Sequence, residues 1–263
     1  MIPVAAPRRV RERLRAVPDG EVEVLHRGTS AMYVAVAGWC VGVLAAGAAR
    51  VPCGLRLAGS TDLPRVLGLS DRFLHEDVVW ADPAAYVSGG TLHVGSSALS
   101  ISRIVETYVP RIRHEVVLQK ATPVTVQATP PATVAGFADS HLTGRRIDAA
   151  TAEALLGRGE GLTPLGDDML AGWLALHRAA GVPTPAVDEV VRTARARTTL
   201  LSATLLDCAL HGEVLPEYAD WLRSVGTPDE PARVRALHSI GATSGAGLHL
   251  GATLALDSLR EAA

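Results

Sequence analysis

The chain has 263 residues, of which 48% are hydrophobic and 4% are aromatic. Such a chain is too apolar to stay disordered, and it predicts a packed globular protein whose interior is filled mainly by Ala, Val and Leu. The formal charge of −2 provides no broad attraction for nucleic acid or for an anionic membrane. We therefore expect small molecules or other proteins as its partners.

One stretch, residues 31–49, carries no charge and is long enough to span a bilayer. Alanine and glycine make up much of it, and it lacks the Leu and Ile density that drives membrane insertion. Two buried strands joined near Ala37 and Gly38 explain it better. The N-terminus places arginines after a weakly apolar start, the reverse of a secretory signal. We expect a cytoplasmic protein, and the three unpaired, widely spaced cysteines agree with a reducing compartment.

The first part of the sequence, residues 1–130, is expected to form a β-rich domain, either barrel-like or a sandwich. Short apolar runs alternate with turn residues, and the pair Gly89-Gly90 suits a tight hairpin because both glycines take positive φ readily. A basic stretch over residues 8–17 is expected to be a helix with a solvated face. Strands are expected at 22–25, 32–36, 39–44 and 78–80 and within 116–126, with a helix over 100–108 that ends before a proline.

Beyond Pro131 the spacing of apolar residues becomes helical, so residues 131–263 are expected to form a helical domain. The fold class is therefore α+β. Helices are expected over 147–156, 164–180, 186–211, 216–225, 231–240 and 248–259.

The strongest local signal for function is the sequence GLTPLGDD at residues 161–168. Thr163 suits the N-cap and Pro164 the first position of a helix, so the glycines before them form a flexible approach to its N-terminus. Free amide groups and the helix dipole favour an anion such as phosphate or carboxylate there. The candidate anion-binding residues of this loop are Gly159, Gly161, Leu162, Thr163 and Gly166.

Asp167 and Asp168 fall in the first turn of this helix, where two carboxylates repel a bound anion unless a cation or proton lies between them. Three interpretations stay open: favourable first-turn charges alone, ligands for Mg²⁺ or Mn²⁺, or hydrogen-bond acceptors and bases for an amide substrate. Gly166 favours a functional role, since a glycine in a helix costs roughly 1 kcal/mol and suggests close approach to the backbone. Both aspartates are thus candidate catalytic residues and candidate ligands for a divalent metal.

A second glycine-rich turn, Gly241–Gly247, also precedes an apolar helical run. Its Thr243 and Ser244 either cap that helix or supply hydroxyl groups to a ligand, with Gly245 beside them. Under the second interpretation the two loops converge on one ligand, and Ser244 joins the candidate catalytic residues.

Between the two loops, Thr198 and Ser202 share a helix face at i, i+4. Their hydroxyls either line the same pocket or bond back to helix carbonyls. His211 ends this run and suits a favourable cation at a helix C-terminus. The sequence contains no G-x-S-x-G, H-E-x-x-H or Walker A motif, which disfavours those reaction classes.

The blocks GLTPLGDDMLAG, TTLLSATLLDCALHG and IGATSGAGLHLGATLAL cover most of residues 157–256, and in this order they resemble the AllH-like family. The resemblance implies a subunit of an oxamate carbamoyltransferase of allantoin and purine catabolism. That reaction interconverts oxalurate and phosphate with oxamate and carbamoyl phosphate. The resemblance also implies partner subunits, one of them similar to acyl-CoA synthetases.

The leading hypothesis is a carbamoyltransferase subunit, working in a complex or homo-oligomer, whose first loop holds phosphate or carboxylate. Two alternatives belong to other classes. One is a metal-dependent hydrolase, since acidic pairs near helix starts also serve dimetal sites. The other is a non-catalytic subunit that binds a small carboxylate while a partner performs the chemistry.

Overall fold

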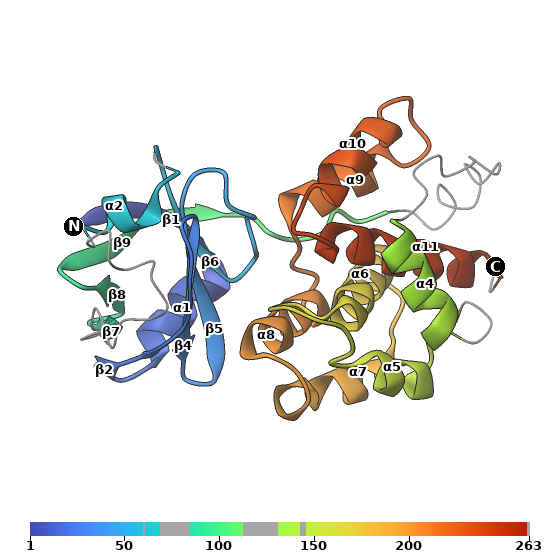
Figure 1. The fold of residues 1–263 in the computed structure, drawn as a ribbon, viewed down its shortest axis with the longest axis horizontal. Coiled ribbons are helices and arrows are strands. Elements are labelled where there is room, and N and C mark those ends of the chain that lie inside the picture. Colours follow the sequence, from blue (N-terminus) through green and yellow to red (C-terminus); the bar gives the residue numbers. More distant parts are fainter. Residues whose placement is uncertain (60, 69–84, 113–130, 143–145, 262–263) are drawn as a thin grey trace. The chain divides into compact units, whose positions relative to one another are not determined.

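A computed structural model describes residues 1–59, 61–68, 85–112, 131–142 and 146–261. By internal contacts the chain divides into two compact units, Met1–Thr107 and Tyr108–Ala263. The first unit is β-rich and the second is helical (Figure 1), which confirms the predicted α+β class. The expected boundary near Pro131 directly follows residues 113–130, which lie outside the described residues.

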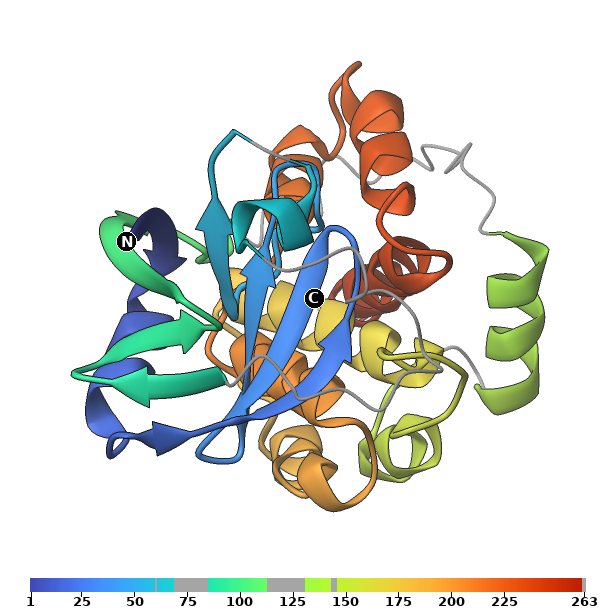
Figure 2. The same ribbon diagram turned by 60° about the vertical axis from the view of Figure 1, so that its left-hand side comes forward.

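The first unit is built on one sheet of nine strands. These are β1 (Ile2–Pro7), β2 (Gly20–Glu21), β3 (Glu23–Arg27), β4 (Ala31–Val36), β5 (Trp39–Leu44), β6 (Gly54–Leu57), β7 (Ala85–Ser88), β8 (Thr91–Val94) and β9 (Ser97–Val105). Their order is β2-β7-β8-β9-β1-β6-β5-β4-β3. The two edge strands, β2 and β3, are separated in sequence by Val22 alone, so the sheet curls until its edges nearly meet (Figure 2). The unit is therefore barrel-like, one of the two predicted forms.

The charge-free stretch forms the hairpin β4–β5, as predicted. Ala37 (φ 48°) and Gly38 (φ 69°) make its two-residue turn, and two positive φ values in succession suit the right-handed twist of the paired strands. Every residue of β5 is buried, which explains why this strand is apolar throughout. The Gly89-Gly90 pair forms the same kind of turn between β7 and β8. No helix in the described part of the chain is long and apolar enough to cross a membrane.

The predicted helix over residues 100–108 is wrong, because residues 97–105 form strand β9. Strand β9 pairs with β8 through residues 97–99 and with β1 through residues 99–105, so within the predicted helix it is the ladder with β1 that outweighs local helical preference. The helix expected over 8–17 is present as α1 (Arg8–Ala16), whose Val10 and Leu14 are buried at i, i+4. A short helix, α2 (Leu63–Val66), follows β6. The strands expected at 78–80 and within 116–126 lie outside the described residues.

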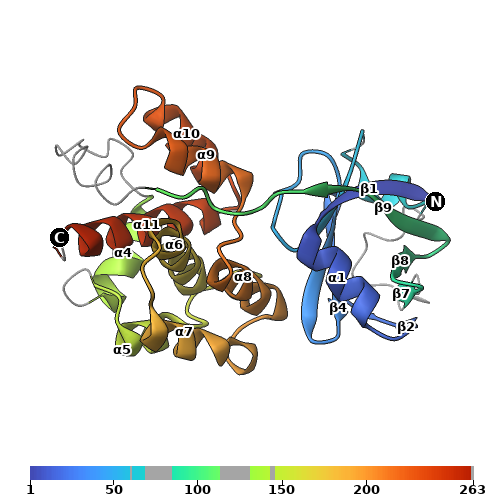
Figure 3. The same ribbon diagram turned by 180° about the vertical axis from the view of Figure 1, so that it is seen from behind.

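The second unit is a set of helices around one buried helix, α6 (Leu165–Ala180). The others are α4 (Ala132–His141), α5 (Ala149–Leu155), α7 (Pro185–Arg192), α8 (Leu200–Leu210), α9 (Pro216–Ser224), α10 (Glu230–His238) and α11 (Ser244–Glu261), with a 3₁₀ turn η2 (Ala194–Ala196). Almost every residue of α6 is buried, because α11, α8 and α5 all pack against it (Figure 3). The predicted helices at 147–156, 164–180, 216–225 and 231–240 are confirmed within a few residues.

The single helix predicted over 186–211 is wrong, since the chain breaks there into α7, η2 and α8. The Thr193 hydroxyl donates to the carbonyl of Val190 and ends α7, while the Thr199 side chain accepts from the amide of Ser202 and caps α8. Both threonines satisfy backbone groups that a continuous helix would have used.

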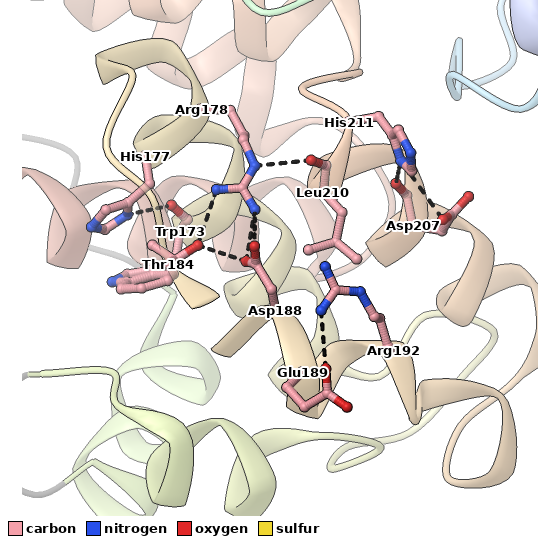
Figure 4. Close-up of polar contacts among 10 residues, drawn as sticks. All are labelled: Trp173, His177, Arg178, Thr184, Asp188, Glu189, Arg192, Asp207, Leu210 and His211. Atoms are coloured by element: carbon pink, nitrogen blue, oxygen red, sulfur yellow. Dashed lines mark hydrogen bonds and ion pairs between the residues drawn. The ribbon is translucent and has the colours of Figure 1, made fainter. Parts of the chain in front are cut away.

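Arg178, in the last turn of α6, ties this helix to its neighbours (Figure 4). Its guanidinium donates to the carbonyl of Leu210 at 2.9 Å, to the Thr184 hydroxyl at 3.0 Å, and to both carboxylate oxygens of Asp188 at 2.6 and 2.7 Å. The Arg178 and Asp188 side chains are 21% and 15% exposed. The charge-assisted hydrogen bonds between Arg178 and Asp188 are therefore stronger than those of an ion pair on an open surface.

Replacing Arg178 by Leu should lower the free energy of unfolding by about 1–3 kcal/mol, because Asp188 and the Leu210 carbonyl then lose partners in a largely buried place. Urea unfolding measures the change. The matched control is Arg192→Gln, which removes the exposed ion pair with Glu189 shown in the same view and should change stability by less than about 0.5 kcal/mol. Equal effects of the two variants would contradict this assignment.

Helices α6 and α11 touch through glycines. A Cβ on Gly172 would overlap the carbonyl oxygen of Leu248, and a Cβ on Gly251 would overlap the carbonyl oxygen of Met169. Only a residue without a side chain permits backbones to approach this closely. The sequence prediction started the last helix at residue 248, yet α11 begins at Ser244, because packing overrides the low helix propensity of its first glycines.

Gly172→Ala should therefore destabilise the helical unit by about 1–3 kcal/mol or more, since α6 and α11 must move apart. The control is Gly136→Ala in α4, where an added Cβ meets nothing within 4 Å and should be neutral or stabilising by up to about 1 kcal/mol. Thermal and urea unfolding of both variants provides the comparison. A Gly172→Ala variant as stable as the parent protein would show that the helices do not meet in this way.

Candidate functional site

The two glycine-rich loops meet at the starts of α6 and α11. The hydroxyls of Thr163 and Ser244 form a hydrogen bond of 2.8 Å across 81 positions of sequence. Beside them, a Cβ on Gly247 would lie 3.0 Å from the Cβ of Asp168. The convergence of the two loops is thus a feature of the fold, and it brings together two hydroxyls and a carboxyl from three places in the sequence.

Asp167 is buried, with 1% of its surface exposed, and its carboxylate is fully engaged. Oδ1 accepts from the amide of Gly157 at 2.7 Å, and Oδ2 accepts from the hydroxyls of Thr198 at 2.5 Å and Ser202 at 2.7 Å. The carboxylate therefore fastens the first glycine loop to α6 and to the start of α8. Thr198 and Ser202, predicted as ligand-binding residues, serve as partners of Asp167.

Asp168 is also buried, with 5% of its surface exposed, but its Oδ2 atom has no hydrogen-bond partner among the residues that the structure describes. A buried polar atom without a partner costs about 1–3 kcal/mol. Such atoms are rare in folded proteins, and they mark places where a ligand, an ion or a proton supplies the missing interaction. The adjacent carboxylate of Asp167 has three donors, so this cost is not a general property of the helix start.

Burial, together with a smaller effect of the nearby charge of Asp167, raises the pKa of Asp168 to about 8. The nearby hydroxyls of Ser244 and Thr163 oppose this shift. Burial also raises the pKa of Asp167, but hydrogen bonds from Gly157, Thr198 and Ser202 and the charge of Arg197 counteract it. Burial thus raises the pKa of both carboxyls, and the donors around Asp167 oppose the rise there.

The glycines of the first loop mostly serve packing. A Cβ on Gly157 would overlap the carbonyl oxygen of Arg197, and a Cβ on Gly166 would overlap that of Leu155. Gly159 has φ +118° and lies against the amide nitrogen of Leu165. Gly161 has φ +90° and open space around it. The presence of Gly166 predicted that another group approaches the helix backbone closely. This is confirmed, and the group is the backbone at the end of α5.

The predicted N-cap role of Thr163 is wrong. The N-cap of α6 is Pro164, which has no capping side chain, and the Thr163 hydroxyl turns to Ser244 instead. The amides of Gly166 and Asp167 have backbone acceptors, the carbonyls of Arg158 and Pro164. An anion at this helix start would therefore depend on donors other than these two amides.

The remaining predicted residues lie around the cluster in different roles. Leu162 is 41% exposed, and its carbonyl accepts from the Thr199 hydroxyl at 2.6 Å. The carbonyl of Thr243 accepts from the amide of Gly247, and Gly245 packs against the backbone of α10. Thr199 is not among the predicted residues, although a threonine directly before an apolar helical run is a typical cap. His211 is the C-cap residue of α8, as predicted.

A divalent cation held by both aspartates would have to displace the three donors from Asp167. In the described part of the chain, no group of three or more His, Cys, Asp or Glu residues is placed to hold a metal ion. The open oxygen of Asp168 is one possible ligand, and a cation there would need hydroxyl groups and water for the rest of its coordination. A hydrogen-bond donor from a ligand would satisfy the open oxygen of Asp168 without displacing the three donors from Asp167.

The fold and the site define an α+β protein whose helical unit carries a partly buried cluster of one carboxyl and two hydroxyls, Asp168, Thr163 and Ser244. Residues 155–256 match the model of the family described as oxamate carbamoyltransferase subunit AllH. The resemblance predicted from the sequence is thus confirmed for this part of the chain, which contains the whole cluster. No curated protein and no solved structure matches the chain.

The pKa of Asp168 predicts a specific pH dependence of stability. Because the folded state raises this pKa from 3.8 to about 8, the carboxyl favours the folded state below pH 4, and that contribution is lost as pH rises to 8. Asp168→Asn should therefore gain stability relative to the parent protein across this window, with a slope that approaches about 1.4 kcal/mol per pH unit. Urea unfolding between pH 5 and 9 measures it. A difference independent of pH would mean that Asp168 titrates normally.

Proposed function

We propose that this chain is a subunit of a carbamoyltransferase that acts on a small carboxylate or amide, such as oxamate or oxalurate, with carbamoyl phosphate or phosphate. In this proposal the cluster of Thr163, Asp168 and Ser244 binds the carbamoyl group. The family match over residues 155–256 supports the reaction class. The observation that carries the assignment of the site is the buried, unpartnered oxygen of Asp168.

A carbamoyl group supplies hydrogen-bonding groups that complement this cluster. Its NH₂ group offers two donors, one of which would satisfy Oδ2 of Asp168, while its carbonyl oxygen accepts from the hydroxyls of Thr163 or Ser244. The charge that acts on Asp168 is that of Asp167, so an additional anion at Oδ2 would be repelled. The cluster therefore favours the uncharged amide end of a substrate over its carboxylate or phosphate end.

Carbamoyl transfer makes two demands on such a site. The acceptor nitrogen forms a bond to the carbamoyl carbon, the bond from that carbon to the phosphate oxygen breaks, and the nitrogen gives up one proton. Negative charge develops on the carbamoyl oxygen, where hydroxyl donors held in place before the reaction lower the barrier. A carboxylate beside the reacting group is a suitable acceptor for the proton. No protein nucleophile is required.

The family description names a subunit, so we further propose that the chain works in the cytoplasm with other carbamoyltransferase subunits, one of them similar to acyl-CoA synthetases, in allantoin and purine catabolism. Bound Mg²⁺ or Mn²⁺ would act in this scheme on the phosphate of the substrate. No observation favours the metal-dependent hydrolase. The non-catalytic alternative uses the same cluster for binding and leaves the transfer to a partner.

Calorimetric titration of the purified chain with oxamate and with carbamoyl phosphate tests the proposal. Asp168→Asn should weaken binding by about tenfold or more, because the amide nitrogen of Asn meets the ligand with a donor where an acceptor is needed. The control is Asp220→Asn on α9, which removes an exposed pair with Arg223 and should leave affinity unchanged.

Unchanged affinity in Asp168→Asn, measured on a folded variant, would remove the cluster from the binding site. The two proposed roles separate in the assembled complex at saturating substrate. A catalytic cluster loses turnover in the variant, whereas a binding cluster keeps it.

A further inference from the structure

Helix α10 is attached to the rest of the helical unit by few apolar contacts. Of its nine residues, only Val234 and Leu237 are buried. Its last turn lies against the start of α11, where a Cβ on Gly245 would overlap the carbonyl oxygen of Leu237. A segment that buries little apolar surface opens locally more easily than the core does. The polar contacts at the end of α10 therefore have a large share in holding it in place.

One of these contacts joins two histidine rings. Nε2 of His238, the last residue of α10, lies 3.0 Å from Nδ1 of His249 on α11, and the ring centroids are 5.0 Å apart. His249 and Gly245 are one turn apart on α11, so both belong to the face that meets the end of α10. His249 is 5% exposed, and its ring also packs edge-to-face against Trp221 of α9. The histidine pair thus links α9, α10 and α11.

We propose that the hydrogen bond between His238 and His249 is an acid-sensitive clasp, which holds the second glycine loop, Gly241–Gly247, in place and releases it when both rings are charged. The loop lies between the two histidines in the sequence. Closing the bond therefore fixes both ends of the connection from α10 to α11. The proposal assigns a positioning role to two residues that lie outside the cluster of Thr163 and Ser244.

The loop that the clasp closes is the one that carries Ser244. The amide of Gly245 donates to the carbonyl of Ile240 at 3.0 Å, and the amide of Gly247 donates to the carbonyl of Thr243 at 2.8 Å. Ser244 lies between these bonded residues, and its hydroxyl meets that of Thr163 at 2.8 Å. Opening of the loop would break these two backbone bonds and displace the Ser244 hydroxyl.

A hydrogen bond between two ring nitrogens requires one proton between them. Two neutral rings meet this condition, because one facing nitrogen carries a proton and the other accepts it. One charged ring also meets it, because the extra proton lies on a nitrogen that faces away from the bond. Two charged rings do not meet it: both facing nitrogens then carry protons, no acceptor remains, and the two positive charges repel each other.

The helices packed around the pair provide no counter-charge for it. Helices α6 and α10 pack against α11, and α9 packs against α10. In the described part of the chain, none of their other titratable residues makes a hydrogen bond or an ion pair with either ring. These residues are Asp167, Asp168, His177 and Arg178 on α6, Glu217, Tyr218, Asp220 and Arg223 on α9, Glu230, Arg233 and Arg235 on α10, and Asp257, Arg260 and Glu261 on α11.

The surroundings of the two rings set the pH range of the clasp. Burial lowers the pKa of His238, and burial together with the charge of His238 lowers the pKa of His249 from 6.5 to about 4. A lowered pKa in the folded chain means that the contribution of the pair to stability is complete above pH 6.5 and is lost as the pH falls towards 4. Within this window the ratio of open to closed loop rises by up to about tenfold per pH unit for each ring.

Amide hydrogen exchange in the full chain, followed by NMR and corrected for the intrinsic exchange rate at each pH, tests the clasp without a ligand. The amides of Gly245 and Gly247 should be at least about tenfold less protected at pH 4.5 than at pH 7. The amide of Leu156 at the end of α5, which donates to the carbonyl of Ala152, should keep its protection. This amide is the control for a general loosening of the protein in acid.

Two variants of the half-buried His238 separate the bond from its pH dependence. In His238→Gln the side-chain amide lies about where Nε2 was, and it carries both a donor and an acceptor, so it can bond to His249 whether that ring is neutral or charged. This variant should stay protected at Gly245 and Gly247 at both pH values. In His238→Asn the side chain is one CH₂ group shorter and does not reach His249, so protection should already be low at pH 7.

Three results would each overturn the proposal. The first is equal protection of Gly245 and Gly247 in the parent protein at pH 7 and pH 4.5, which needs no variant to be observed. The second is full protection in His238→Asn at pH 7, because the loop would then be held without the bond. The third is a loss of protection at pH 4.5 in His238→Gln as large as in the parent protein, because acid would then act elsewhere.

The consequence for ligand binding rests on the proposed function, in which Ser244 contacts the carbamoyl group. Oxamate should bind His238→Gln and the parent protein equally at pH 7, and should bind the variant several-fold more tightly at pH 4.5. No binding of oxamate to either protein at pH 7 would count against the proposed function, while the exchange measurement still decides the clasp. Equal affinities at pH 4.5, together with the expected exchange difference, would show that the clasp does not control the ligand site.

Discussion

The close contact between α6 and α11 is the constraint on which the rest of the helical unit depends. Glycines at 172, 247 and 251 permit it, because any side chain at these positions would meet the backbone or side chains of the opposite helix. Backbones this close exclude water from the residues between them. As a result the start of α11 lies against the start of α6, and Ser244 comes within hydrogen-bond distance of Thr163.

That contact also sets the electrostatic character of the candidate site. Asp168 faces α11 at Gly247, so its carboxyl is taken out of water without receiving a positively charged partner. The free energy lost by burying it is offset by the packing of the two helices. In the proposed function the open oxygen of this carboxyl is the group that meets the ligand, and proteins commonly accept such a cost in stability at functional sites.

Asp167 has a different role, because it holds an irregular loop against the helical core. The loop from Gly157 to Pro164 has little regular structure of its own, and the Asp167 carboxylate connects it to α6 and α8 with three hydrogen bonds. Since the same loop carries Thr163, the placement of one member of the cluster depends on Asp167. The Asp167 side chain thus holds the loop in place, fixes the position of the Thr163 hydroxyl and supplies the charge beside Asp168.

The sequence by itself determined the β-rich and helical parts, the hairpins at Ala37-Gly38 and Gly89-Gly90, and most helices of the second part, because alternation, helical spacing and positive-φ turns are local properties. It also identified the two glycine loops and the family resemblance. Only the tertiary structure decided the strand at Ser97–Val105, which depends on two neighbouring strands, and the helical state of Ser244–Gly247, which depends on α6. It alone distinguished Asp167, with three donors, from Asp168, with an open oxygen. Adjacent identical residues carry the same local signal, and their difference lies in the partners of Asp167, which are between ten and thirty-five positions away.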